Sequence, residues 1–341
     1  MYQRPNGYES GLEQLFKQGS QSSLDLFNTL ALTAFRHQYD HNPVYQNWCN
    51  LRKVNPSLVQ SIDAIPFLPI SVYKTQTVAC FKVCENEVFL SSQTTGEHPS
   101  RHYIYELEWY HRQVKRCFEF ALGDLNQFNW IALLPHYMER TGSSLISMCR
   151  ELMRQCGQNG DDFFMKADPD FKHRFEQLQK SSKITLVLGV RFAFMEWINA
   201  FDFGSEVILI ETGGMKNRGK DLSRQAFINL LQDKTRASAI YSEYGMTELF
   251  SQCYAKNREP FKCPPSMRVL VRSESNPNLR YSSSKSGAMD IIDLANIDTC
   301  SFIATEDVAE LYPDGTFEIL GRLDHSGTRG CHALWTESVH T

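Results

Sequence analysis

The stretch ITLVLGVRFAFMEWINAFDFGSEVILIE, residues 184–211, decides the fold class. Its apolar runs at 184–190 and 206–211 predict two buried strands, and the segment at 191–200 between them predicts a helix. WIALL (130–134) and ASAIY (237–241) predict two further strands, with helices near 143–156 and 221–232. Because strands and helices alternate along this part of the chain, we expect an α/β sheet covered by helices.

The segments on either side have different patterns of apolar residues. LDLFNTLALTAFR (24–36) has apolar residues at helical spacing, and a second amphipathic helix is predicted over about 103–122, closed by Gly123. After about residue 260 the patterns predict strands alone, and VAELYPDGTFEILG (308–321) predicts a hairpin that turns at Pro313-Asp314-Gly315. The sequence therefore predicts an α/β core with a helical N-terminal segment over 1–260 and a β-rich subdomain with a short tail over 261–341.

The composition excludes several classes of protein. With 42% hydrophobic and 22% charged residues the chain is typical of a soluble globular protein. A net charge of -4 gives no basic surface for nucleic acid, and no apolar run is long enough for a membrane span. The N-terminus MYQRPNGYESG has no secretory h-region, and the 10 cysteines form no C-x-x-C pair. We expect a cytoplasmic protein with reduced thiols and no zinc.

LSSQTTGEHPSRH (90–102) places a cluster of small residues directly after an apolar run: Ser91, Ser92, Thr94, Thr95 and Gly96. Hydroxyl and backbone N–H donors with small side chains suit a loop that wraps phosphate oxygens. Taken alone, the cluster favours a surface turn, because most Ser/Thr/Gly clusters are turns.

YSEYGMTELFSQ (241–252) follows a predicted buried strand, at the edge of the sheet where ligands bind in such folds. Tyr244 offers a flat ring for a base, Gly245 allows close backbone approach, and Thr247 can donate to a phosphate oxygen. Glu248 supplies the carboxylate oxygen that Mg²⁺ prefers. A plain strand-to-helix turn with a partly buried tyrosine explains the stretch about as well.

Two more stretches have ambiguous signals. ETGGMKNRGK (211–220) puts Gly213 and Gly214 after a strand, which marks either a close ligand approach or a turn, and the turn is favoured. Asp307 lies among apolar strand positions, and Arg322 follows the other strand of the predicted hairpin. The pair is suited to gripping a ribose diol, although a cross-strand ion pair is the more common role for such residues.

In order along the chain, the Ser/Thr/Gly loop, the Gly-Gly turn, YGMTE, the Asp before a hairpin and the GRLD after it resemble the adenylate-forming enzymes. These include acyl- and aryl-CoA ligases, firefly luciferase and peptide-synthetase adenylation domains. SSQTTGEHPSRH, LLPHYMERTGSSL, ETGGMK and GRLDHSGTRGC make the chain most similar to the LuxE-type acyl-protein synthetases. The resemblance runs over about 60–335. It implies the large N-terminal domain of the superfamily, with mixed sheets, covering helices and a small β region.

The resemblance also implies a reaction and a set of site residues. Such enzymes join a carboxylic acid, here a fatty acid, to ATP to give an acyl-adenylate and pyrophosphate, with Mg²⁺ as the metal. The loop at 91–96 then binds the β- and γ-phosphates. Gly213 and Gly214 line the adenine, Tyr244 stacks on it, and Gly245 passes close by. Thr247 contacts the α-phosphate, Glu248 holds Mg²⁺, and Asp307 with Arg322 holds the ribose.

Three features depart from the superfamily pattern. Gln93 stands where the loop usually has glycine, and Arg101 is the nearest cation where a lysine is usual. The third is the short tail after GRLDHSGTRGC, which predicts that the mobile C-terminal domain of CoA ligases is absent. LuxE-type enzymes also lack that domain and carry the acyl group on a cysteine near the C-terminus, which makes Cys331 the expected acceptor.

Three functions remain open from the sequence. The first is an acyl-protein synthetase that loads Cys331 or passes the acyl group to a partner, either an accepting protein or a reductase. The second is a carboxylate–CoA ligase, and the third is a degenerate nucleotide-binding scaffold. His136 is expected to be structural and Arg140 to be a surface cation. Trp109, Tyr110 and Phe118 are expected in the core or on a helix surface rather than in a ligand cage.

Overall fold

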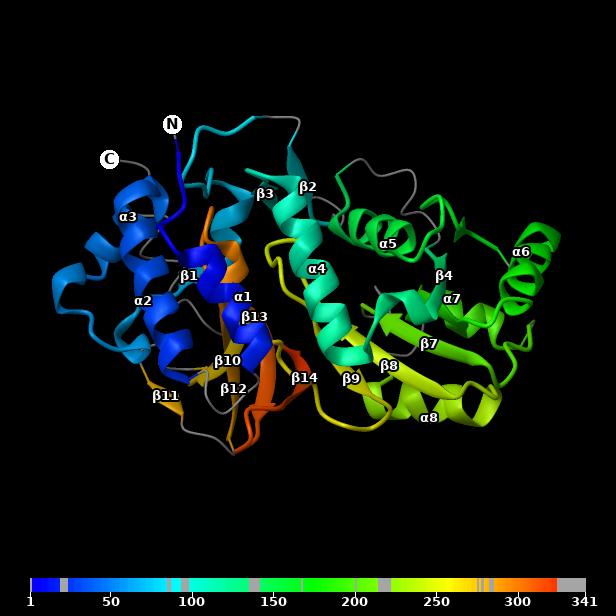
Figure 1. The fold of residues 1–341 in the computed structure, drawn as a ribbon. Coiled ribbons are helices and arrows are strands. Elements are labelled where there is room, and N and C mark those ends of the chain that lie inside the picture. The colour runs from blue at the N-terminus through cyan, green and yellow to red at the C-terminus, as the bar shows by residue number, and fades with distance from the viewer. Residues whose placement is uncertain are drawn as a thin grey trace.

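The computed structural model describes residues 2–18, 24–84, 87–92, 98–134, 142–166, 168–199, 201–213, 222–274, 276, 279–281 and 285–323. Its α-helices are α1 (Tyr8–Gln18), α2 (Leu24–His41), α3 (Pro43–Leu51), α4 (Leu107–Leu122), α5 (Ser144–Gln155), α6 (Pro169–Gln179), α7 (Arg191–Trp197) and α8 (Arg224–Lys234). Figure 1 shows α1–α3 beside one sheet and α4–α8 around the other. None of these described helices combines the length and apolar character that crossing a bilayer requires.

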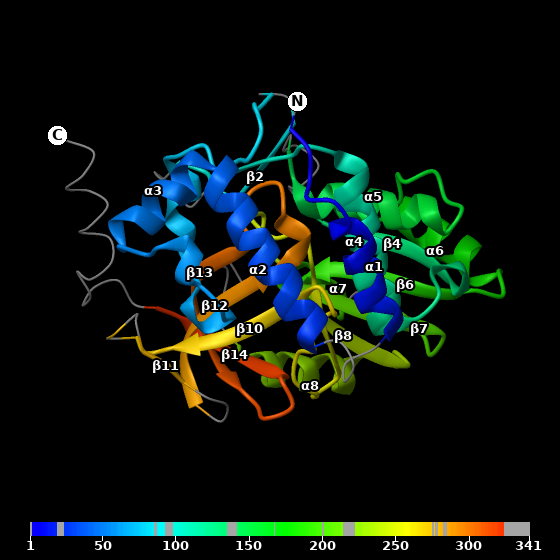
Figure 2. The same cartoon turned by 60° about the vertical axis from the view of Figure 1, so that its left-hand side comes forward.

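The larger α/β unit is built on a sheet with strand order β5-β4-β6-β7-β8-β9. Its strands are β4 (Phe128–Leu133), β5 (Phe163–Phe164), β6 (Ile184–Val190), β7 (Val207–Thr212), β8 (Ala239–Tyr244) and β9 (Cys253–Lys256). Strands β5 to β8 pair in parallel, and β9 closes the edge antiparallel to β8. Helices α4 and α5 cover one face and α8 the other (Figures 1 and 2). The predicted α/β sheet is therefore confirmed.

The second sheet is largely antiparallel and has the order β1-β13-β12-β10-β11, and β14 also pairs with β13. Its strands are β1 (Leu68–Pro69), β10 (Met267–Arg272), β11 (Arg280–Tyr281), β12 (Lys285–Asp293), β13 (Phe302–Leu311) and β14 (Phe317–Arg322). The predicted hairpin is confirmed: Gly315 has a φ of 84° and its amide donates to the Tyr312 carbonyl. The short strand β1, from the N-terminal part of the chain, pairs with β13.

The N-terminal helices pack on this second sheet. Gln38 of α2 is fully buried and donates to the carbonyls of Asn296 and Ile297, in the connection between β12 and β13. Figure 2 shows α2 lying across the strands of this sheet. The predicted domain division at residue 260 stays a prediction. The contacts of Gln38 show that the N-terminal helices share a core with the C-terminal sheet.

One predicted boundary is wrong. The helix expected over about 103–122 begins at Leu107 and ends, as predicted, at Gly123, which has a φ of 95°. The residues before it form strand β3 (Arg101–Tyr103), which pairs antiparallel with β2 (Val88–Leu90). Hydrogen bonds to a strand across the loop stabilise β3, and the spacing of apolar residues along the sequence does not indicate such pairing. Trp109, Tyr110 and Phe118 are buried in the core, as expected.

Candidate active site

The Ser/Thr/Gly loop starts and ends on the paired strands β2 and β3. Ser91 continues the ladder, because its amide donates to the Ser100 carbonyl at 3.1 Å and its hydroxyl accepts from the Ser100 amide at 2.8 Å. Ser92, the next residue, is exposed. Gln93, Thr94, Thr95 and Gly96 lie outside the described residues. The loop therefore has a fixed base, and its phosphate-binding role stays a prediction.

The YGMTE segment follows β8, as expected. Tyr244 is the last residue of the strand and is half-buried. A Cβ at position 245 would lie 2.5 Å from Oε1 of Glu243, so a larger residue there would require that buried carboxylate to shift. Residues 245–252 form neither helix nor strand, so their backbone groups need partners from elsewhere in the fold.

Tyr244, Asp307 and Arg322 meet where the two sheets adjoin. Asp307 and Arg322 are register partners on β13 and β14. The Tyr244 hydroxyl donates to Oδ2 of Asp307 at 2.8 Å, and Nε of Arg322 donates to Oδ1 at 3.2 Å. The Asp307 side chain is 10% exposed and that of Arg322 is 75% exposed. Burial and the Asp307 carboxylate raise the pKa of the Tyr244 phenol, so the phenol remains a donor.

Glu248 lies close to this group in a buried position. Burial raises the pKa of its carboxyl, and a hydrogen bond from the Ser100 hydroxyl works against that shift. The same carboxyl senses the charges of Arg322 and Asp307. Ser100 therefore links the base of the Ser/Thr/Gly loop to Glu248, and Thr247 beside it is half-buried.

Gly213 follows the last residue of β7 and has a left-handed φ of 71°, and no atom of the described residues lies within 4 Å of where its Cβ would be. Thr212 is the register partner of Glu243, so Gly213 lies at the same sheet edge as Tyr244. Gly214, His136, Arg140 and Cys331 lie outside the described residues. The structure thus brings together Ser91, Gly213, Tyr244, Gly245, Thr247, Glu248, Asp307 and Arg322.

Three polar residues of this region were not predicted from the sequence. Nδ1 of His102 lies 2.8 Å from the Thr247 carbonyl oxygen, and the Asn296 amide donates to the Glu248 carbonyl at 2.7 Å. The Asp293 carboxylate accepts from the amides of Phe250 and Ser251. His102 stands in the quoted stretch 90–102, so its position was visible, but nothing local indicates its partner 145 positions away.

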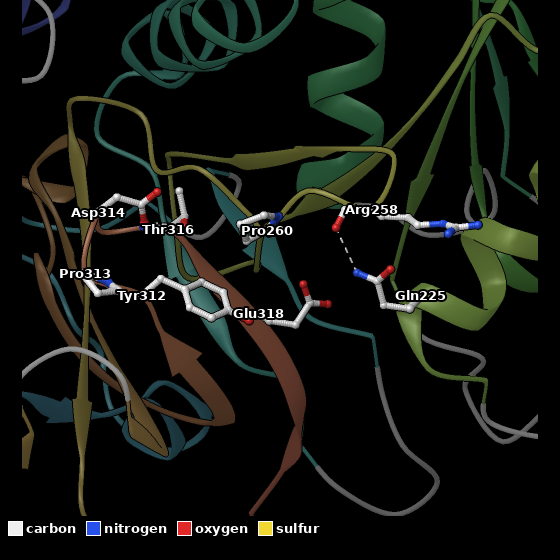
Figure 3. A pocket seen from close by; sticks show the side chains of 8 residues that line it. All are labelled: Gln225, Arg258, Pro260, Tyr312, Pro313, Asp314, Thr316 and Glu318. Carbon is white, nitrogen blue, oxygen red and sulfur yellow. Dashed lines mark hydrogen bonds between the residues drawn. The ribbon is translucent and has the colours of Figure 1, made fainter.

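A separate groove of about 610 Å³ lies beside the tip of the β13–β14 hairpin. Figure 3 shows Tyr312, Pro313 and Glu318 on one side and Gln225 and Arg258 on the other. None of the predicted site residues lines it. Asp307 and Arg322 pair at the opposite end of the ladder from the turn, so the groove is distinct from the candidate site.

The donor set fits a magnesium nucleotide. Glu248 and Asp307 supply hard carboxylate oxygens, which suit Mg²⁺ or ribose hydroxyls. The exposed Arg322 guanidinium can face an anion, and Gly213 leaves room for a ligand close to the backbone. The half-buried Tyr244 ring already packs edge-on against Phe261 and Phe317, at centroid distances of 6.0 Å and 5.9 Å.

Comparisons with known proteins support this picture. Residues 14–114 match the family model described as acyl-protein synthetase, LuxE. A 70-residue segment, 20% of this chain, is 40% identical to the long-chain-fatty-acid–luciferin-component ligase of Photorhabdus luminescens. That segment spans 58% of the length of this curated relative.

Solved structures match over a larger part of the chain. An open conformation of 2-hydroxyisobutyryl-CoA ligase in complex with 2-HIB-AMP and CoA has a TM-score of 0.66 and 13% identity, over 89% of this chain and 70% of that one. The thioesterification state of the same ligase covers 95% of this chain and 73% of its own, again at 0.66 and 13%.

A more distant structure has the same fold. O-succinylbenzoate coenzyme A synthetase from Bacillus subtilis, in complex with ATP and a magnesium ion, has a TM-score of 0.50 and 14% identity over 70% of this chain and 51% of that one. At such identities the likeness establishes the fold alone. The chain therefore has the fold of the large N-terminal domain of the adenylate-forming enzymes, and its residues 14–114 match the LuxE acyl-protein synthetase family.

Proposed function

We propose that this protein uses ATP to activate a carboxylic acid, and specifically a fatty acid. The carboxylate oxygen forms a bond to the α-phosphorus of ATP, and the bond from that phosphorus to pyrophosphate breaks. The products are an acyl-adenylate and pyrophosphate. The acyl group then passes to a protein thiol, for which we propose Cys331: the thiolate forms a bond to the acyl carbon and AMP leaves.

The observation that carries this proposal is the junction of Tyr244, Asp307 and Arg322. Asp307 accepts from a phenol of one sheet and a guanidinium of its own sheet, at 2.8 Å and 3.2 Å. An ion pair whose arginine is 75% exposed contributes little stability, so stability alone does not explain the arrangement. A carboxylate aimed at the sheet edge and supported by an exposed cation is suited to a ribose diol and the neighbouring phosphate.

Glu248 and Thr247 would act at the reacting phosphate. A Mg²⁺ ion bound with ATP would neutralise the charge that builds up on pyrophosphate, and Glu248 is the residue proposed to hold it. The Thr247 hydroxyl would donate to an α-phosphate oxygen and hold it for in-line attack. Ser91, Ser92, Thr94, Thr95 and Gly96 would bind the leaving phosphates.

The first experiment measures carboxylate-dependent exchange between ATP and labelled pyrophosphate over a panel of fatty and aryl acids. We expect exchange with fatty acids, and a loss of at least about 100-fold in Glu248→Gln. The matched control is Glu310→Gln, a carboxylate on β13 whose phenol partner is 3.4 Å away at the hairpin. A folded protein that binds ATP but exchanges with no acid would instead be the degenerate scaffold.

The second experiment identifies the acyl acceptor. Labelled acid and ATP should leave label on the protein, and hydroxylamine should remove it because a thioester is cleaved by that nucleophile. Cys331→Ser should abolish the label while exchange persists, and Cys84→Ser, which removes an exposed thiol, should change neither. Label that survives in Cys331→Ser contradicts the acceptor assignment. Transfer to free CoA without protein labelling would identify a CoA ligase.

A further inference from the structure

The segment that carries Thr247 and Glu248 is held by buried side chains, because it belongs to no helix or strand. Nδ1 of His102 lies 2.8 Å from the Thr247 carbonyl, and the Asn296 amide holds the next carbonyl, that of Glu248, at 2.7 Å. His102 itself is fully buried on β3. The consecutive carbonyls of Thr247 and Glu248 therefore depend on side-chain partners for their orientation.

The position of the proton on His102 follows from its partners. A carbonyl oxygen only accepts, so the nitrogen that faces Thr247 must carry the proton. Burial lowers the pKa of the imidazole to about 4, and the ring is therefore neutral at physiological pH. Nε2 then has a lone pair and accepts from the Thr299 hydroxyl at 3.0 Å. The Thr247 carbonyl thus fixes the tautomer in which Nδ1 donates, and the Thr299 hydroxyl complements it by donating to Nε2.

Aromatic rings pack against the imidazole of His102. The imidazole packs against Phe250 with ring centroids 4.8 Å apart and meets Tyr73 edge-on at 5.7 Å. Ser100, two positions earlier on the same side of the chain, hydrogen-bonds the Glu248 carboxyl. The strand that closes the Ser/Thr/Gly loop therefore contacts both the backbone of Thr247 and the side chain of Glu248.

We propose that His102 is a positioning residue for acyl-adenylate formation: its Nδ1–H holds the Thr247 carbonyl and so fixes Thr247 and Glu248 relative to the base of the Ser/Thr/Gly loop. This inference rests on the proposed function. His102 touches no substrate in this role. It fixes the distance between the base of the Ser/Thr/Gly loop and the two residues proposed to act on the α-phosphate and the metal.

Two substitutions separate this role from simple burial. The side-chain nitrogen of asparagine falls where Nδ1 of histidine lies, and that of glutamine falls where Nε2 lies. His102→Asn therefore keeps the donor to Thr247, and His102→Gln keeps only the contact with Thr299. We expect kcat for exchange to fall about 30- to 100-fold in His102→Gln, with KM for ATP changed less than about 3-fold. His102→Asn should keep kcat within about 5-fold of the unaltered protein.

A second pair of variants tests the tautomer without changing the histidine. Thr299→Ser keeps the hydroxyl and should leave kcat unchanged, whereas Thr299→Val removes it and should lower kcat several-fold. The nitrogen NMR spectrum of His102 is a readout that is independent of activity. It should show a protonated Nδ1 and an unprotonated Nε2 in the unaltered protein and in both Thr299 variants, because the Thr247 carbonyl fixes the tautomer. The Nε2 signal should shift in Thr299→Val, which removes the hydrogen bond to that nitrogen.

The outcomes distinguish this inference from the proposed function. If the unaltered protein exchanges pyrophosphate with no acid, the proposed function fails, and the NMR spectra still decide whether Nδ1 holds the carbonyl. If the unaltered protein is active and His102→Asn loses as much kcat as His102→Gln at equal melting temperatures, His102 has a packing role and the inference is overturned. Full activity in His102→Gln overturns it as well.

Discussion

Asp307 shows how one residue can serve both the fold and the site. Its carboxylate joins a phenol at the end of β8 to a guanidinium on β14, yet one of these partners is largely solvated. Exposed ion pairs contribute about 1 kcal/mol or less to stability. This is why we propose a ligand-binding role for the Asp307 oxygens.

Asp307→Asn tests this reading. The amide oxygen still accepts from Tyr244, so the free energy of unfolding should fall by less than about 1 kcal/mol. The KM for ATP in pyrophosphate exchange should rise at least about 10-fold with kcat little changed, because a lost ribose contact weakens substrate and transition state equally. Glu310→Gln, on the same strand, is the control. An unchanged KM in Asp307→Asn would remove Asp307 from the nucleotide site.

Glu243 makes the stability of the protein depend on pH. This buried carboxyl accepts from the Thr212 hydroxyl, and burial raises its pKa to about 7. A carboxyl with a raised pKa in the folded state binds more protons when folded, so its contribution is complete below about pH 4.5 and is lost as the pH rises towards 7. The shift corresponds to at most about 3 kcal/mol.

Glu243→Gln should therefore be more stable than the unaltered protein at pH 8 by up to about 3 kcal/mol, and nearly equal to it at pH 4.5. Urea denaturation at the two pH values measures the difference. The control is Glu310→Gln, which should leave the pH dependence unchanged. Equal differences at both pH values would mean that Glu243 titrates normally.

At the scale of elements, the hairpin that presents Asp307 and Arg322 depends on one left-handed residue. Gly315 has a φ of 84°, and a Cβ there would meet nothing within 4 Å. Gly315→Ala should therefore cost only backbone strain, about 1 kcal/mol of unfolding free energy, while Gly315→Asn should cost less because asparagine tolerates this conformation. Equal losses in the two variants, measured by thermal unfolding, would contradict this origin.

The elements were predictable where one local signal was enough. A local apolar run is enough to predict a buried strand, as in β4, β6, β7 and β8. The residues Pro313-Asp314-Gly315 are likewise enough to predict a turn. Helix α6 was missed although its signals were present: Asp168 caps it, Pro169 is its first residue, and Phe171 and Phe175 share a face. The predicted helix began too early, at Tyr103, which is the last residue of β3 and pairs with β2 across a loop.

The residues of the candidate site could be proposed from the sequence, but the side chains that hold their backbone in place could not. Tyr244, Glu248, Asp307 and Arg322 were proposed from ordered motifs. The structure places Tyr244 and Arg322 in contact with Asp307 and puts Glu248 nearby, and their binding roles stay a prediction. His102 and Asn296 were not identified because the side chain of each contacts a backbone carbonyl. Every residue has such a carbonyl, so the identity of the partner residue does not indicate the contact. Only the folded chain reveals which carbonyl lies beside which side chain.

At the scale of the whole molecule, the site exists only while the two sheets keep their relative position, since Tyr244 belongs to one sheet and Asp307 to the other. Arg224 of α8 contributes to this position. Its guanidinium forms a bidentate pair with Glu318 of β14, at 2.8 Å and 2.7 Å, and also donates to the carbonyls of Asn257 and Glu259. The side chains of the pair are 3% and 15% exposed.

Arg224→Met should lower the free energy of unfolding by about 3–5 kcal/mol, because it leaves a buried carboxylate and two carbonyls without a partner. The double variant Arg224→Met with Glu318→Leu should recover part of this loss, since the unpaired charge is gone. Arg236→Ala is the control: its pair with Asp202 is equally short but 70% and 62% exposed, and its loss should cost less than about 1 kcal/mol. Urea denaturation measures all three, and the KM for ATP should rise in Arg224→Met as the two sheets loosen.

If Arg224→Met and Arg236→Ala lower the free energy of unfolding by the same amount, the Arg224–Glu318 pair does not hold the sheets. The position of Tyr244 against Asp307 must then depend on the apolar contacts of Phe261 and Phe317.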